Sequence, residues 1–185
     1  MAETNALPTN ITPGTADHAT LHNNVNARAA KYGTGSPEGV ITAVPGVTYA
    51  DTDATLGVST WIKASGTGNT GWKPLIADTG FRSVAGSLIN SWTASAAVIR
   101  RINNTVELRF ISLTGGSAAA VYNLPSGFQP TSSNVRAVFF GADDVATAPV
   151  VIGTAITLPA VAAGTFCVTY TTTQAWPTSL PGSAA

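Results

Sequence analysis

The chain has 185 residues, of which 44% are hydrophobic and only 10% are charged, and its nine basic and nine acidic residues give a net charge of zero. An ordinary soluble protein carries about 25% charged residues, and a near-neutral surface favours association. We therefore expect much of this surface to contact other protein. The scattered basic residues argue against nucleic-acid binding, and no apolar run reaches the roughly 18 residues of a membrane span.

Residues 1–33 are predicted to be an extended arm followed by a helical collar. Pro8 and Pro13 exclude a helix from residues 1–15, and Thr15 is a suitable N-cap for a helix over residues 16–32. The spacing of its apolar and aromatic positions indicates a short coiled-coil seam. The seam that we expect to be the oligomer interface consists of His18, Leu21, Val25 and Tyr32.

Residues 34–76 form a predicted Gly-rich β-module. Short strand-like runs at 40–42, 47–49 and 59–63 alternate with turn signals, and the segment 64–71 (ASGTGNTG) is turn-forming. A module of about 40 residues buries too little surface to be stable alone, so we expect it to pack on its own copies.

Residues 77–185 are predicted to form a C-terminal antiparallel β-sandwich, similar to a jelly roll. Three runs alternate between two faces, with Val106, Leu108 and Phe110 together on one of them. By the same period of two, Phe139 and Phe140 lie on opposite faces of one strand, and Phe166 and Cys167 lie on opposite faces of another. Turn signals recur between these runs, which is typical of a sandwich or barrel.

The sequence contains no set of residues that indicates catalysis, so we expect no enzyme and no cofactor. Asp51 with Asp53, and Asp143 with Asp144, lie in turn-like segments, where carboxylates usually cap backbone amides. His18 and His22 are four residues apart on the predicted helix and are weak candidates for a metal site, because no further ligand lies nearby in the sequence.

The lone Cys167 and the four tryptophans carry the remaining expectations about individual side chains. We expect Cys167 to be a buried structural thiol. Tryptophans usually lie in a core or an interface. We expect the four tryptophans to follow this rule; Trp176 is the one most open to exposure, since Pro177 follows it, and its ring is a possible glycan contact.

Three stretches of the chain resemble fibre and minor tail proteins of tailed bacteriophages, especially those of actinobacterial hosts. The first is residues 7–33, LPTNITPGTADHATLHNNVNARAAKYG. The second and most specific joins GSPEGVITA (35–43) to WIKASGTGNTGW (61–72). The third runs from LINSWT (88–93) through VELR (106–109) to YNLPSGFQP (122–130) and resembles the β-sandwich at fibre tips. The chain is short for such a protein, which leaves head fibre or capsid decoration protein as a close alternative.

The resemblance implies a structural virion surface protein, a short homotrimeric fibre or spike made in the host cytoplasm. Its N-terminal arm would attach to other virion proteins, and its C-terminal domain would be displayed. A receptor-binding protein that recognises a host cell-surface glycan is the alternative, and a depolymerase is the weakest one. The sequence does not decide between the tail and the head of the particle.

Overall fold

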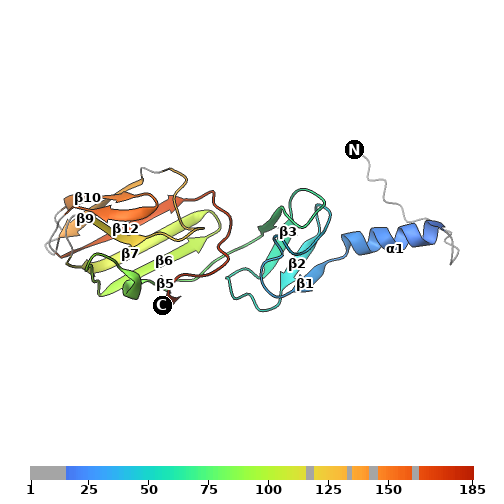
Figure 1. Cartoon of the computed structure of the whole chain (residues 1–185), viewed down its shortest axis with the longest axis horizontal. Coiled ribbons are helices and arrows are strands. Elements are labelled where there is room, and N and C mark those ends of the chain that lie inside the picture. The colour runs from blue at the N-terminus through green and yellow to red at the C-terminus, as the bar shows by residue number, and fades with distance from the viewer. Residues whose placement is uncertain (1–15, 116–118, 133–134, 142–145, 160–162) are drawn as a thin grey trace. The chain divides into compact units, whose positions relative to one another are not determined.

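The structure is a computed structural model that describes residues 16–115, 119–132, 135–141, 146–159 and 163–185 (Figure 1). The arm predicted over residues 1–15 lies outside the described residues. The chain divides into two compact units. The N-terminal unit contains residues Met1–Asp53 and Ser59–Leu75, and the C-terminal unit contains Ala54–Val58 and Ile76–Ala185.

One α-helix, α1 (Ala16–Arg28), precedes the first sheet. It ends earlier than predicted, because residues Lys31–Gly33 form strand β1 beside β2. The Nζ of Lys31 donates to the carbonyl of Asn26 at 2.7 Å and satisfies part of the helix C-terminus. The prediction that Tyr32 belongs to a helical seam is therefore wrong, since Tyr32 pairs with Ala50 in a sheet.

The N-terminal unit contains a four-stranded sheet in the order β1-β2-β3-β4. Its further strands are β2 (Thr48–Asp51), β3 (Thr60–Lys63) and β4 (Trp72–Pro74). Strand β1 is parallel to β2, and the other pairs are antiparallel. The strand predicted at residues 40–42 is wrong: the amides of Val40 and Ile41 both donate to the carbonyl of Pro37, which makes this run a turn.

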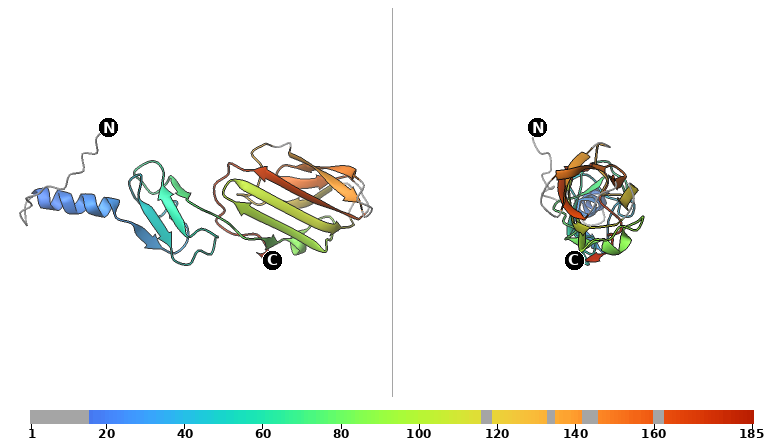
Figure 2. Two further views of the ribbon diagram at one scale, coloured as in Figure 1. Left: turned by 180° about the vertical axis from the view of Figure 1, so that it is seen from behind. Right: turned by 90° about the vertical axis from the view of Figure 1, so that its left-hand side faces the viewer.

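The C-terminal unit contains one nine-stranded sheet that curls strongly, as the two views of Figure 2 show. Its strands are β5 (Arg82–Ser83), β6 (Ala96–Ile102), β7 (Thr105–Leu113), β8 (Ala119–Asn123), β9 (Val135–Gly141), β10 (Ala146–Ile152), β11 (Ala155–Leu158), β12 (Gly164–Thr171) and β13 (Ser183–Ala184). Their order is β13-β5-β6-β7-β12-β9-β10-β11-β8, and all neighbours are antiparallel. The prediction of a mainly β chain with a large antiparallel sheet is confirmed at this level.

Successive side chains along these strands point alternately into the core and to the outer face. Val106, Leu108 and Phe110 of β7 are fully buried, and Phe110 stacks on Phe166 of β12 with 4.9 Å between ring centroids. Phe139 of β9 joins the same core. The alternation predicted from the sequence is therefore confirmed in β7, β9 and β12.

A connecting segment carries the chain from β5 to the opposite edge of the curled sheet. It contains the 3-10 helix η1 (Ala85–Ser87). The amide of Ile89 donates to the carbonyl of Val121 in β8 at 2.9 Å, and the Asn90 side chain donates to Ala120 at 2.8 Å. The edge strand β8 thereby gains hydrogen-bond partners that an exposed edge would lack.

Candidate functional site: buried cations and an uncharged sheet face

The structure describes only part of the predicted helical interface. His18 and Leu21 lie within α1, but their side chains are outside the described residues. Val25 is 53% exposed on α1, and Tyr32 is 80% exposed on β1. His22 is exposed on α1, and the predicted pairing of His18 and His22 at a metal stays a prediction.

Trp176 is buried, as expected of a tryptophan, which contradicts its role as a glycan contact, and the expectation of a buried Cys167 is wrong. Trp176 is only 8% exposed, because its indole N–H donates to the carbonyl of Leu56 at 3.0 Å and its ring packs on the guanidinium of Arg101. No ring face is left for a sugar. Cys167 is exposed, because Phe166 and Val168 point into the core and the alternation of β12 turns the thiol outward.

Lys63 is buried at the centre of the Gly-rich module. Its side chain is 1% exposed, and its Nζ donates to the carbonyl of Gly68 at 2.8 Å and to that of Thr70. The same ammonium lies 5.8 Å from the centroid of the Trp72 ring. A buried charge is costly unless it is well bonded, so the carbonyls and the ring together make this position tolerable. Lys63 thus holds the loop between β3 and β4.

Glu38 fixes the far end of the same loop. Its two carboxylate oxygens accept from the amides of Gly71 at 3.1 Å and Trp72 at 2.8 Å. Asn69 exchanges hydrogen bonds with Gly39, and the Trp72 indole donates to Ile41. We call the set of Glu38, Lys63, Asn69 and Trp72 the loop clamp.

Gly71 shows why the clamp tolerates no larger residue at the end of the loop. Its φ is +90°, and a Cβ added there would lie 2.4 Å from the carbonyl oxygen of Ser65. Both the left-handed backbone and the close approach therefore require glycine.

Arg101 is the corresponding buried cation of the C-terminal unit and is 3% exposed. Four backbone carbonyls accept from its guanidinium: Asn103 from Nε at 2.7 Å, Ala175 and Gly127 from Nη1, with Ala175 at 2.8 Å, and Gln174 from Nη2 at 2.9 Å. Its Cζ lies 4.9 Å from the centroid of the Trp176 ring. Burial lowers the pKa of Arg101 to about 10, so the group stays charged at neutral pH. We call these residues the Arg101 cluster.

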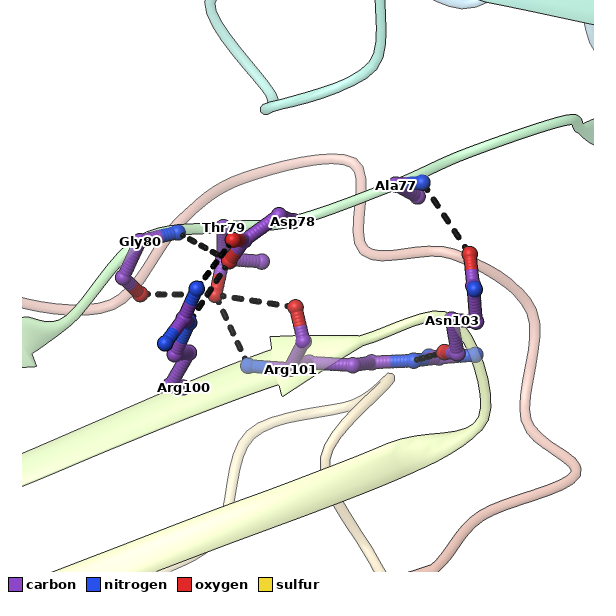
Figure 3. A network of polar contacts seen from close by, with 7 residues as sticks. All are labelled: Ala77, Asp78, Thr79, Gly80, Arg100, Arg101 and Asn103. Carbon is purple, nitrogen blue, oxygen red and sulfur yellow. Dashed lines mark hydrogen bonds and ion pairs between the residues drawn. The ribbon is translucent and has the colours of Figure 1, made fainter.

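A polar network next to the Arg101 cluster fastens residues 77–80 to β6 (Figure 3). The Asn103 side chain accepts from the amide of Ala77 at 3.0 Å. Thr79 donates its amide to the carbonyl of Arg101 at 3.0 Å, and its hydroxyl oxygen accepts from the Arg101 amide at 2.9 Å. The network therefore satisfies backbone groups where the segment meets the sheet.

Two ion pairs lie on the surface of β6 and β7 around Phe81. Arg100 contacts Asp78 through two nitrogens, and the Arg109 guanidinium contacts Glu107. Both guanidinium groups also lie over the Phe81 ring, at 5.1 Å and 4.6 Å from its centroid. The hydrogen bond from Arg100 lowers the pKa of Asp78 and raises that of Arg100. These arginines are occupied within the fold and offer little to an anionic ligand.

The outer face differs in character at the Ile111 end of β7 and over strands β9, β10 and β12. Three large apolar side chains are exposed there: Ile111 of β7 (41%), Val138 of β9 (46%) and Phe140 of β9 (43%). Pro149 of β10 and Cys167 of β12 are exposed beside them. We call these five residues the outer apolar face.

The sequence gives one signal for the buried cations that the predictions missed. Lys63 lies two residues after the buried Trp61 in β3, and Arg101 lies two residues after the buried Ile99 in β6, so each points to the same face as its neighbour. Both strands therefore place a cation on a buried face. The carbonyls that receive these cations lie in irregular segments, and no residue type marks them.

The predicted acidic pairs have structural roles where they are described. Asp51 is 6% exposed, and its Oδ1 accepts from the amides of Gly35 at 2.8 Å and Asp53 at 3.3 Å. This confirms the expected capping role for Asp51. Asp143 and Asp144 lie outside the described residues. Within the described part of the chain, no three His, Cys, Asp or Glu side chains gather as a metal site would need.

Comparisons with known proteins found no matching family model, no matching curated protein and no matching solved structure. Among the residues that the structure describes, no helix has the length and apolar character needed to cross a bilayer.

Proposed function

We propose that the chain is a structural protein of a tailed-phage virion surface, a short homotrimeric fibre or spike. The loop clamp supports this proposal most directly. The stretch that resembles phage fibre modules most specifically is the one in which Glu38 and Lys63 hold the Gly-rich loop. The residues that carry the resemblance therefore serve architecture, as a structural module requires.

The exposed apolar residues support assembly with further protein. Val25 on α1 and the outer apolar face both present large side chains to solvent, on a chain with only 10% charged residues. In this proposal α1 contributes to a homotrimer, the C-terminal sheet folds as a jelly-roll-like sandwich, and the N-terminal arm contacts other virion proteins. The protein is not an enzyme in this proposal. The glycan-binding alternative has lost Trp176, its candidate residue.

Imaging tests the location. An antibody against the chain should label intact particles at a fixed position on the tail or the capsid, whereas labelling of host material alone would contradict the proposal. Light scattering after size exclusion tests the assembly. The expected mass is about three times 18.7 kDa, and a monomer at every concentration would refute the trimer.

A further inference from the structure

We infer that a second copy of this chain packs on the outer apolar face. The inference deepens the proposed function, because it rests on self-association and names a contact surface outside the predicted helix.

The five residues lie next to one another on adjacent strands. Val138 of β9 is paired in register with Pro149 of β10, and Phe140 is paired with Thr165 of β12. Cys167 lies two residues beyond Thr165 on the same outward side of β12. Ile111 precedes Ser112, whose amide donates to the Thr165 hydroxyl at 3.3 Å. The exposed apolar groups thus lie near one another on the same side of the sheet, with the polar residues Thr165 and Ser112 between them.

Charge separates this surface from the rest of the outer face. Strands β8, β10, β11 and β12 contain no charged residue, and β9 contains one, Arg136. Strands β6 and β7 carry the Arg100 and Glu107–Arg109 groups instead, and Arg109 is paired in register with Cys167, so this thiol lies at the edge of the apolar surface. The outward side of an antiparallel sheet that faces water is usually polar. The outer apolar face departs from that rule over β9, β10 and β12 and at the Ile111 end of β7.

The absence of charge in these strand sequences also indicates which molecule packs on the outer apolar face. Two copies of such a surface meet with little like-charge repulsion and leave few buried charges without a partner. A strongly charged partner would lose hydration and gain no ion pair in return. Another copy of this charge-poor chain fits both conditions, and the small, weakly polar thiol of Cys167 is compatible with an apolar contact.

The size of the surface agrees with one contact of an oligomer. Four strands about 4.8 Å apart and seven residues at about 3.3 Å each give an upper limit of roughly 19 by 23 Å for the footprint, since the charged part of β7 lies outside it. This upper limit of about 440 Å² is about half of the roughly 800 Å² that each partner of a standard interface buries. A stable assembly therefore needs a second contact, for which the exposed Val25 of α1 is available.

The test uses the full chain and places a charge in the centre of this surface. In Phe140→Glu we expect association to weaken about 100-fold, because the carboxylate would be buried without a partner. The matched control is Thr105→Glu, which adds the same charge at an exposed position of β7 outside the surface and should leave the mass unchanged. Sedimentation over a range of concentrations gives the mass, and circular dichroism checks the fold. If Phe140→Glu does not fold, Val138→Lys repeats the test.

Cys167 supplies a readout that needs no substitution. Its reaction with a thiol-specific disulfide reagent should be slow in the wild-type oligomer and fast in dissociated Phe140→Glu. A wild-type oligomer that keeps its mass in Phe140→Glu, with Cys167 equally reactive in both, would overturn this inference and leave the trimer standing. A wild-type monomer with a freely reactive Cys167 would overturn the trimer and the inference together.

Discussion

Each of the two units buries a cation among backbone carbonyls, but the carbonyls that the two cations contact lie at different distances along the sequence. Lys63 bonds to carbonyls five and seven residues away in a single loop. Arg101 bonds to Asn103, two residues away, and also to Gly127 and Ala175, which are 26 and 74 residues away. A planar guanidinium has five donors in a fixed arrangement, whereas an ammonium is a compact point charge. The arginine can therefore join several segments, and the lysine organises one.

The surroundings of the two cations differ as well. Arg101 lies in a unit whose described core contains nineteen buried hydrophobic residues. The described buried hydrophobic residues of the N-terminal unit are Ala43, Val47, Tyr49, Trp61 and Trp72. A unit with so small a core depends more on polar contacts such as the loop clamp.

Loss of Arg101 should have the largest effect on stability. In Arg101→Met we expect the C-terminal unit to lose about 3–5 kcal/mol, because one buried and three partly buried carbonyls lose their donor. Arg101→Lys should recover only part of this. Denaturant unfolding measures the change, and exposed Arg136→Met is the control. If Arg101→Met unfolded like the wild type, the comparison between the two cations would fail.

Loss of Lys63 should have a smaller effect, confined to the N-terminal unit. We expect Lys63→Met to cost about 2–4 kcal/mol, since the carbonyls of Gly68 and Thr70 lose their donor. Hydrogen exchange read by mass spectrometry should show faster exchange in residues 59–75, with the strands of the C-terminal sheet unchanged. Faster exchange throughout the chain would contradict a local role for Lys63.

Glu38→Gln should cost less, about 1 kcal/mol, because glutamine keeps one acceptor and loses the charge that strengthens both hydrogen bonds. The amides of Gly71 and Trp72 should exchange faster, which nuclear magnetic resonance can follow residue by residue. The matched control is Lys73→Gln, which changes an exposed residue of β4 next to Trp72. Unchanged exchange at both amides would show that Glu38 does not hold the loop.

The partly exposed pair of Asp78 and Arg100 should contribute least, below about 1 kcal/mol. Arg100 lowers the pKa of Asp78 from its ordinary 3.8, so the folded state binds this proton less readily than the unfolded state. The stabilisation is present above that ordinary pKa and is lost as the pH falls below it. The stability difference between the wild type and Asp78→Asn should therefore shrink between pH 5 and about pH 2. A difference that does not depend on pH would exclude this role for the pair.

The sequence predicted the parts of the fold that follow from local pattern. The alternation in β7 and β12 placed Phe110 and Phe166 correctly, because a strand facing a core repeats every two residues. It did not show that residues after Arg28 leave the helix, since the competing pairing of Tyr32 with Ala50 is a contact distant in sequence. The predicted strand at 40–42 was wrong for a similar reason: turn bonds to Pro37 outweighed the β-preference of a very short run.

The errors about individual side chains have the same origin. Pro177 made Trp176 the tryptophan most open to exposure and hence a glycan candidate, yet the partners that bury it, Leu56 and Arg101, lie far away in the sequence. Cys167 could have been placed correctly, because the alternation that turned Phe166 inward already turned Cys167 outward. The buried cations depend on carbonyl groups, which every residue carries and no sequence pattern distinguishes.

The bond between Trp176 and Leu56 also bears on how the chain matures during synthesis. The Leu56 carbonyl accepts from an indole 120 residues later in the chain. At about 5–20 residues per second, a ribosome needs about 6–24 s to make that stretch. During this interval the loop of residues 54–58 exists without the ring that fixes it. The wait is longer than most elementary folding steps, so we expect this loop to be among the last parts of the C-terminal unit to become protected in the nascent protein.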